Sequence, residues 1–476
     1  MATATTRQLT ARDLLRFHMA DDPQVAPDGT AVAWVHTRID ADTNSYRAAI
    51  FTTDLRSGET RQLTAGVAQD THPRWSPDSR TIAFLAGVAR PADDAPPPAA
   101  SVIGAGPQLH VVAASGGAAV RLTNLLCGVR DIAWSPDGTR IAFTTLVDPA
   151  KGLETLASDT PPADPYERFN RDVLTVSRVR WKSDGLGYIG NRYRQLGVVA
   201  FAPAADPPPA PLLLTNGAFD LSAAAWSPDG STLATTGNLD PDGEWRRKSY
   251  IYLVNADATT PVAPVELLGL EEMRSSDLAW SPDGTTIAVC GHNDRTVGHY
   301  GNQMLWLVTV ANGLGRCVTT HIDRAFGDYS RNGDMRRYGG DDGPRWHPDG
   351  TSLLVLNNEA GAVHLCRFTL ADGSLTPLTD GDCCVVAFST DAEQKQTVAL
   401  VGASINPGDI YLLDTSTSEP QAMRRLSDVN GELLAEVKLA EPIRFRCPSR
   451  DGTVAIDGWI HAPANREPGK RYPVIL

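Results

Sequence analysis

Short segments in which apolar and polar residues alternate recur along most of this chain. Examples are residues 81–84 (TIAF), 140–143 (RIAF) and 286–289 (TIAV), and each of them follows a turn that contains Pro and Asp. A period of two with β-branched and aromatic residues is typical of half-buried β-strands. The pattern therefore predicts an all-β chain that is assembled from hairpins.

The turn that precedes these strands is nearly the same each time. It reads AWSPDGT at 133–139 and at 279–285, AWSPDGS at 225–231, RWSPDS at 74–79 and RWHPDGT at 345–351. Pro suits a turn position that needs a φ of about −65°, Asp can bond the local backbone, and Gly can adopt the positive φ that closes the turn. We therefore interpret the Ser and Asp of this motif as turn-forming residues rather than catalytic ones.

A second recurring mark, in which a Leu and a Thr precede a turn, lies downstream of each hairpin. Its copies are RQLTAG (61–66), VRLTNL (120–125), LLLTNG (212–217), VELLGL (265–270), RCVTTH (316–321), TPLTDG (376–381) and RRLSDV (424–429). The hairpin starts that match these ends lie at Pro27, Pro77, Pro136, Pro228, Pro282, Pro348 and the degenerate segment 388–394 (FSTDAEQ). Each start and its matching end are interpreted as the limits of one repeated unit, and the second mark is interpreted as that unit's terminal strand.

Units of about four short strands cannot bury both faces alone, and stacking them radially produces a β-propeller. We predict a seven-bladed β-propeller over residues 21–430, in which the tryptophan before each turn packs between neighbouring blades. Six or eight blades are left open, because a further turn (WKSDGLG, 181–187) falls inside the long third unit. Residues 1–20 are expected to form a helical N-terminal extension.

The pattern changes after Asn430. Residues 431–476 carry no blade turn and instead predict a strand over 442–446, a turn at 449–452, a strand over 454–461 and an apolar strand that begins at Tyr472.

The order of these motifs resembles the prolyl oligopeptidase family of serine peptidases, and within it the acylaminoacyl-peptidase and dipeptidyl-peptidase-like branch. The resemblance covers essentially the whole chain and is carried by the turns together with SRDGTVAIDGWIHAP (449–463), RYPVIL (471–476), the opening 10–35 and VRWKSDGLGYIGNRYRQLGVV (179–199). It implies that residues 431–476 are the first strands of an α/β-hydrolase domain that is truncated in this chain.

The same resemblance implies a catalytic Ser-Asp-His triad, with its serine in a GxSxG elbow. The sequence contains no GxSxG motif, and in this it departs from the family pattern. We therefore expect the catalytic residues to lie beyond Leu476 and these 476 residues to be inactive alone.

The chain is acidic, with 43 Lys and Arg against 56 Asp and Glu and a net charge of −13. Such a balance argues against nucleic acid or an anionic membrane as a partner. The first twenty residues contain no apolar signal core and no apolar run is long enough to span a membrane, so we expect a cytoplasmic protein. The seven cysteines form no CxxC pair, which favours reduced thiols.

Two glycine-containing segments imitate ligand-binding motifs. GLGYIG (185–190) fits a dinucleotide pattern but precedes an alternating strand instead of a helix, so we predict a hairpin. NLDPDGEWRRKS (238–249) imitates a calcium loop but has Ser249 where the bidentate Glu belongs. None of the ten histidines lies in an HExxH motif, and we expect neither a metal nor a cofactor.

Clustered arginines are the candidate binding residues. Arg246 and Arg247 follow Trp245, and a polar run over 321–343 carries the others, which are Arg331, Arg336 and Arg337. Arginine forks bind carboxylates through paired hydrogen bonds, so these side chains are candidates for binding the terminal carboxylate or an acidic side chain of a short peptide. Loop charges that contact only water are the alternative.

The expected partners are thus short peptides and the peptidase catalytic domain, and self-association is left open. A second hypothesis for the whole chain is a non-enzymatic propeller that binds other proteins as a scaffold.

Overall fold

The structure is a computed structural model that describes residues 6–475, except for 68, 88–105, 156–177, 184–186, 206, 247, 274–277, 298–300, 330–342, 418 and 421. The described chain is all-β, as the alternating pattern predicts. Its helical elements are a short 3-10 helix, η1 (Ala11–Arg16), and one short α-helix, α2 (Gly431–Glu436). Within the described ranges, no helix has the length and apolar character needed to cross a membrane.

The first half of the chain forms antiparallel sheets whose strands pair mostly in sequence order. The strands are β1 (His18–Val25), β2 (Ala31–Asp40), β3 (Ser45–Asp54), β4 (Thr60–Gln62), β5 (Asp70–Trp75), β6 (Thr81–Ala86), β7 (Gln108–Ala113), β8 (Val120–Arg121), β9 (Arg130–Trp134), β10 (Arg140–Val147), β11 (Lys182–Ser183), β12 (Gly187–Tyr188), β13 (Tyr193–Ala200) and β14 (Leu212–Leu213). Strands β1–β4, β5–β8 and β9–β10–β13–β14 each form a four-stranded sheet. The predicted glycine-rich hairpin is confirmed as the small pair β11–β12, which lies between β10 and β13.

The second half continues the same arrangement. Its strands are β15 (Leu221–Trp226), β16 (Thr232–Gly237), β17 (Ser249–Asn255), β18 (Val265–Leu270), β19 (Glu272–Met273), β20 (Ala279–Trp280), β21 (Thr286–His292), β22 (Met304–Thr309), β23 (Gly315–Cys317), β24 (Arg345–Trp346), β25 (Ser352–Glu359), β26 (Ala362–Thr369), β27 (Leu375–Pro377), β28 (Cys384–Thr390), β29 (Gln396–Ala403), β30 (Asn406–Asp414) and β31 (Arg424–Arg425). Strands β15–β18 form a four-stranded sheet and β19–β23 a five-stranded one. The eight-stranded sheet β24–β31 consists of two antiparallel meanders joined by one parallel pair, Val363 with Cys384.

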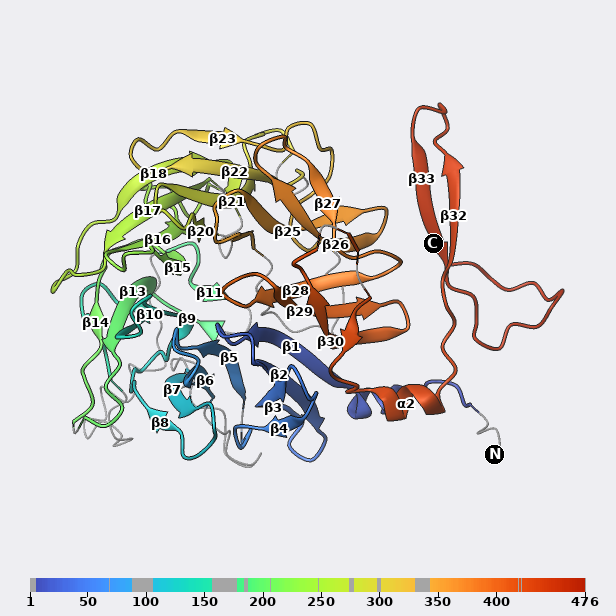
Figure 1. The fold of residues 1–476 in the computed structure, drawn as a ribbon, viewed down its shortest axis with the longest axis horizontal. Coiled ribbons are helices and arrows are strands. Elements are labelled where there is room, and N and C mark those ends of the chain that lie inside the picture. The colour runs from blue at the N-terminus through green and yellow to red at the C-terminus, as the bar shows by residue number, and fades with distance from the viewer. Residues whose placement is uncertain are drawn as a thin grey trace.

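These sheets follow one another around a ring in sequence order (Figure 1). The chain enters the ring with β1 and leaves it after β31, beside the point where it entered. Each predicted terminal segment overlaps an edge strand, and these edge strands are β4, β8, β14, β18, β23, β27 and β31.

The repeated turn has the hydrogen bonds expected from its sequence. At the copy that begins with Trp280, the Ser281 hydroxyl donates to Asp283 Oδ1 at 2.6 Å, and the Thr285 N–H donates to the same oxygen at 3.0 Å. Gly284 has a φ of 71°, a backbone conformation that a side chain would strain. These bonds hold the pKa of Asp283 below its usual range, which confirms this carboxylate as a turn former.

The tryptophan before each turn joins neighbouring sheets, as predicted. Each indole N–H donates to a backbone carbonyl on the first strand of the preceding sheet, one residue before that strand's own tryptophan position. These bonds run from Trp75 to Gln24 at 2.8 Å and, each at 3.0 Å, from Trp134 to Arg74, Trp226 to Ala133, Trp280 to Ala225 and Trp346 to Ala279. Neighbouring sheets are thus joined by the same contact, which lies at the equivalent position just before each turn.

The contact between the first and last sheets, as far as the structure describes it, lacks the recurring bond from an indole N–H to a backbone carbonyl, although Trp34 of β2 belongs to the buried cluster there. Val25 and Phe388 stand at the two tryptophan positions concerned, and a buried apolar cluster that includes Val25, Val32, Leu400 and Ile410 fills this contact. The Val25 N–H also donates to the Ser389 hydroxyl at 2.8 Å. The closure therefore depends mainly on side-chain packing, which the repeat alone does not specify.

The N-terminal segment is fastened to the segment that leaves the ring. The Arg7 N–H donates to the Glu436 carbonyl at 2.9 Å, and Arg16 Nη1 pairs with the Glu436 carboxylate at 2.7 Å. Helix η1 precedes β1, which begins at His18, three residues before the predicted start of the propeller.

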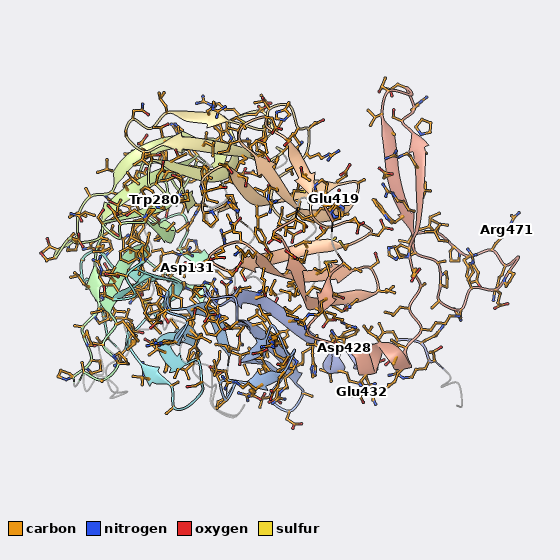
Figure 2. The ribbon with its side chains drawn as sticks, viewed as in Figure 1. Asp131, Trp280, Glu419, Asp428, Glu432 and Arg471 are labelled. Carbon is orange, nitrogen blue, oxygen red and sulfur yellow. The ribbon has the colours of Figure 1, made fainter. Side chains whose placement is uncertain are left out.

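The last described strands form a separate hairpin, β32 (Ile443–Pro448) with β33 (Ala455–Ile460). This hairpin stands beside the ring, and Arg471 lies far out in the loop that follows it (Figure 2). The apolar strand expected from Tyr472 onward is not formed over residues 472–475, because no neighbouring strand lies beside them to supply hydrogen bonds.

Candidate substrate-binding pocket

The two ends of the ring differ in their connections. One end, called the turn end here, carries the AWSPDGT-type turns between the first and second strands of each sheet. The other, called the connection end, carries the links between the second and third strands, such as residues 238–248 between β16 and β17. The chain also leaves β31 at the connection end, and Arg444 of the β32–β33 hairpin lies 4.0 Å from Asp382 there.

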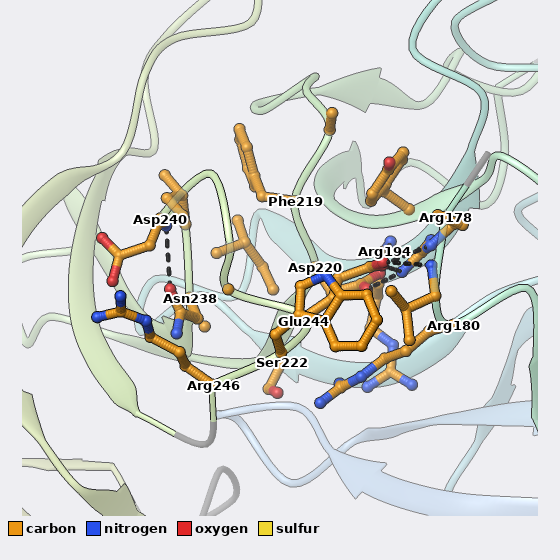
Figure 3. Close-up of a pocket in the computed structure, with 18 of the residues that line it drawn as sticks. Arg178, Arg180, Arg194, Phe219, Asp220, Ser222, Asn238, Asp240, Glu244 and Arg246 are labelled. Carbon is orange, nitrogen blue, oxygen red and sulfur yellow. Dashed lines mark hydrogen bonds and ion pairs between the residues drawn. The ribbon is translucent and has the colours of Figure 1, made fainter.

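A pocket of about 800 Å³ opens at the connection end between the third and fourth sheets. Its walls are the segment 178–182, the start of β13, the segment 218–222 and the β16–β17 connection. Figure 3 shows Arg178, Arg180 and Arg194 on one side of this pocket, with Asp240 and Arg246 on the opposite side.

The pocket is basic although the protein is acidic. The basic lining residues are Arg178, Arg180, Lys182, Arg194, Arg246 and Lys248, and the acidic ones are Asp220, Asp240 and Glu244. Positive charges therefore exceed negative ones by three in this pocket. Such a local excess favours a small anionic ligand, since the surrounding low dielectric strengthens its attraction to the arginines.

Arg178 links residues of one wall of the pocket. Its side chain is 2% exposed, and its guanidinium lies 4.0 Å above the centre of the Tyr193 ring. Arg178 Nη2 pairs with Asp220 at 2.5 Å, and Nε donates to Glu244 Oε1 at 2.6 Å. The charge of Arg178 is thus satisfied within the chain, and we assign it a structural role.

The neighbouring arginines are less well satisfied. Within the part of the chain that the structure describes, the Nε atoms of Arg130, Arg192 and Arg194 are all buried without a hydrogen-bond partner. Burial, together with the nearby charge of Arg194, lowers the pKa of Arg130. Buried donors without acceptors are rare in proteins, and here they gather in one corner of the third sheet.

The calcium-like loop turns its oxygen atoms toward its own residues. Asp240 accepts a hydrogen bond from the Tyr250 hydroxyl at 2.9 Å, and Asp242 pairs with Arg246 at 2.7 Å. Asn238 Oδ1 accepts the Asp240 N–H at 3.0 Å. These bonds leave the loop's oxygen atoms engaged within the chain rather than converging on a common point, as a calcium ion would need.

The structure places only one of the five arginines that were predicted from the sequence to bind substrate. Arg246 lies on the pocket wall, with its side chain 64% exposed. Arg247, Arg331, Arg336 and Arg337 lie outside the described residues.

Sequence reasoning did not select Arg130, Arg180 or Arg194. A signal was present in the run NRYR (191–194), where two arginines alternate next to a predicted strand. The convergence of Arg180 and Arg194 with residues of the fourth sheet is visible only in the folded chain.

Successive antiparallel sheets of about four strands, arranged in a ring, are typical of a β-propeller. Comparison with known proteins places this chain among peptidase relatives. It is 26% identical over 468 residues to the uncharacterized peptidase YuxL of Bacillus subtilis, an alignment that covers 98% of this chain and 65% of YuxL. It is 23% identical to dipeptidyl-peptidase 5 of Porphyromonas gingivalis, over 100% of this chain and 63% of that protein.

Solved structures show the same fold. An acylaminoacyl peptidase in complex with Z-Gly-Gly-Phe-chloromethyl ketone matches with a TM-score of 0.68 at 18% identity, over 98% of this chain and 61% of that one. The β-propeller domain of the Trilobed protease from Pyrococcus furiosus matches with a TM-score of 0.52 at 14% identity, over 87% of this chain and 97% of that one. A family model described as "WD domain, G-beta repeat" matches residues 275–300.

The predicted resemblance to prolyl oligopeptidase family peptidases is therefore confirmed, since homologues over almost the whole chain are peptidases. The chain spans 65% and 63% of the length of the two curated relatives.

Proposed function

We propose that this chain is the propeller portion of a cytoplasmic serine peptidase that hydrolyses short peptides, including N-acylated ones. The observation that carries the proposal is the alignment of 98% of the chain with a longer peptidase. The catalytic triad would lie outside these residues, which agrees with the absence of a GxSxG motif from the sequence. The cysteines are all free, as expected in a reducing compartment.

The proposed domain division is a seven-bladed propeller over residues 21–430 followed by the first strands of a hydrolase domain over 431–476. The edge strands at the predicted terminal segments support this count of blades. The exposed apolar side chains of the hairpin support the second domain, since an isolated hairpin is marginally stable in water. These side chains include Phe445, Ile456, Trp459 and Ile460, all at least 40% exposed.

In this proposal the propeller limits access to the catalytic serine. The pocket and the hairpin share the connection end, so a substrate held in the pocket would face the hydrolase domain. Acyl transfer by the triad would follow the usual course, in which histidine removes the proton of the serine hydroxyl and aspartate orients the histidine. The five predicted arginines would bind the acidic groups of the peptide.

A serine-directed fluorophosphonate probe tests where the nucleophile lies. We expect no labelling of the 476-residue chain and labelling of a gene product that continues beyond Leu476, together with hydrolysis of short peptides by that product. Labelling of the 476-residue chain would contradict the proposed position of the triad. Failure of the longer product to cleave any peptide would contradict the peptidase assignment.

Substitution of the predicted arginines tests their role in the longer product. Replacing Arg336 and Arg337 together with Ala should raise KM for acidic peptides with little change in kcat, because the contacts concern binding rather than the reacting bond. Arg80→Ala, which removes an exposed arginine at the turn end, is the matched control. An unchanged KM in the double variant would remove these residues from the binding site.

A scaffold propeller is the second candidate, and the WD-repeat match over residues 275–300 is the observation that favours it. Sequencing the gene beyond the codon for Leu476 separates the two functions. A GxSxG motif there supports the peptidase, and its absence supports the scaffold.

A further inference from the structure

We propose that Arg194 and Arg180 form an anion-binding subsite that binds a carboxylate of a peptide, either its C-terminus or an acidic side chain. The choice of a peptide as ligand rests on the proposed function. The binding of its carboxylate does not, because it can be measured without hydrolysis.

Arg194 carries a hydrogen-bond donor that has no acceptor in the described structure. Its Nε is buried in the described structure without an acceptor, although a buried hydrogen-bond donor that is left unpaired destabilises the fold. Arg130 and Arg192 carry buried, unpaired Nε atoms in the same part of the third sheet. Of these three arginines only Arg194 lines the pocket, and because its Nε is buried, an acceptor in the pocket would meet the outer part of its guanidinium.

The acidic groups beside these arginines already accept hydrogen bonds from other residues of the chain. Asp220 accepts the Arg194 backbone N–H at 2.7 Å through Oδ1 and pairs with Arg178 at 2.5 Å through Oδ2. Glu244 accepts from Arg178 through Oε1 and from the Val179 N–H at 2.8 Å through Oε2. On the described pocket wall, these two carboxylates are therefore committed to holding the wall together.

Arg180 and Arg194 differ in their exposure to solvent. Arg180 is exposed at the pocket mouth, while Arg194 is partly buried, and both lie on the same side of the pocket (Figure 3). A guanidinium binds a carboxylate through two parallel hydrogen bonds, so one arginine at the mouth and one deeper suit a single carboxylate group that enters from solvent. Trp245, which is 77% exposed on the same pocket, adds an apolar surface for the rest of the peptide.

The size and charge of the molecule limit the ligand to a small anion. A pocket of about 800 Å³ accommodates the end of a short peptide. A polyanion such as nucleic acid would meet the negative charge of the rest of the protein, which totals −13. A ligand with a single carboxylate is small enough to contact only the positively charged pocket and so avoids this repulsion.

Three N-acetylated probe peptides distinguish the two sources of the carboxylate. Ac-Ala-Ala-Ala offers a C-terminal carboxylate, Ac-Ala-Glu-Ala-amide a side-chain carboxylate, and Ac-Ala-Ala-Ala-amide neither. We expect the 476-residue chain to bind at least one of the first two about ten-fold more tightly than the third, as measured by calorimetry. Whichever of the two binds identifies the source. Equal affinity for all three peptides, or no binding of any, would overturn the proposal.

Variants locate the subsite. Arg180→Ala should weaken binding of the preferred peptide by about ten-fold, as expected for the loss of one charge-assisted contact, and it should leave the melting temperature unchanged because Arg180 is exposed. Arg194→Gln should weaken binding by at least as much, and Arg80→Ala at the turn end should leave it unchanged. Unchanged affinity in Arg180→Ala and Arg194→Gln would refute the subsite, even if Arg194→Gln lowers stability. Peptide binding by this chain without peptidase activity in the longer gene product would refute only the proposed function.

Discussion

The turns at residues 281–286 and 449–454 have nearly the same sequence and the same hydrogen bonds but very different surroundings. In both, a Ser hydroxyl donates to an Asp Oδ1 at 2.6 Å and the Gly has a φ of 71°. Strand β21, which follows the first turn, is largely buried in the ring, whereas β32, which precedes the second, is exposed along its whole length. The turn therefore specifies a hairpin but not its burial.

The difference lies in what each hairpin has beside it. Trp280 donates to the Ala225 carbonyl of the preceding sheet and packs against a buried cluster. Trp459 of the hairpin is 40% exposed and approaches the ring near Gly361, where an added Cβ would come within 2.5 Å of the indole. Burial thus requires a neighbouring sheet, which the β32–β33 hairpin lacks in the described structure.

The largest difference in stability between the ring and the hairpin is expected when a tryptophan is removed from each. Trp226→Ala should lower the free energy of unfolding by about 3–5 kcal/mol, because it leaves a cavity and removes the indole bond to the Ala133 carbonyl. Trp459→Ala should lower it by less than about 1 kcal/mol, since an exposed side chain that is truncated loses few contacts. Urea unfolding followed by circular dichroism measures both. Comparable losses would mean that the hairpin is part of the cooperative unit of the ring.

The turn serines provide the next test. Ser135→Ala removes the hydroxyl that accepts the Arg140 N–H at 2.9 Å and should cost about 1 kcal/mol of unfolding free energy, because a partly buried N–H loses its partner. Ser449→Ala removes the equivalent bond to the Val454 N–H at 3.0 Å, where water can replace it. The free energy of unfolding of the ring should therefore not change in Ser449→Ala. A decrease equal to that in Ser135→Ala would contradict the inference that the hairpin does not contribute to the stability of the ring.

Acid should act on the two turns differently. Hydrogen bonds, chiefly from Ser135 and Ser449, lower the pKa of Asp137 and of Asp451 from 3.8 to about 2. A carboxyl with a lowered pKa in the folded state contributes stability above about pH 4, and this contribution is lost as the pH falls toward 2.

The pH dependence is read out by replacing each carboxyl. Asp137→Asn should flatten part of the decline in ring stability between about pH 4 and pH 2, whereas Asp451→Asn should leave that decline unchanged. Chemical denaturation at several pH values gives the slopes. An equal flattening in both variants would show that the hairpin turn stabilises the ring.

The smallest expected effect concerns the contact between hairpin and ring. Gly361 and Gly381 both have a positive φ, of 87° and 80°, so Ala at either position should cost about 1 kcal/mol of backbone strain. Only at Gly361 would the new Cβ meet Trp459, whereas nothing lies within 4 Å of one at Gly381. Gly361→Ala should therefore shift Trp459 fluorescence and Gly381→Ala should not. The same spectrum in both variants would show that the hairpin does not rest on the ring.

Much of the fold follows from short-range patterns. Turn geometry, edge strands and the tryptophan contacts could be predicted, because Pro, Asp and Gly act within a few residues and the repeat supplies its own neighbours. The start of β1 at His18 could not be predicted, since its backbone N–H and carbonyl bond the Asn430 side chain, which is far away in the sequence. The expected strand after Tyr472 is not formed, since it has no strand partner in the described chain. For the pocket, the sequence predicted Arg246 but not Arg194. Arg194 is a candidate binding residue only because residues of the third and fourth sheets come together around it.

Local turns and motifs of fixed order encode the hairpin repeat, the radial stacking of sheets and the resemblance to peptidases, so these could be inferred without a structure. Which buried hydrogen-bond donors lack an acceptor in the described chain depends on how the sheets pack. Asp220 and Glu244 are adjacent to Arg178 only after the third and fourth sheets stack, and that pairing leaves Arg194 without an acceptor for its buried Nε in the described chain. The interactions between charges in a pocket depend on the distances between residues of different strands, and the spacing of residues along the sequence does not give those distances.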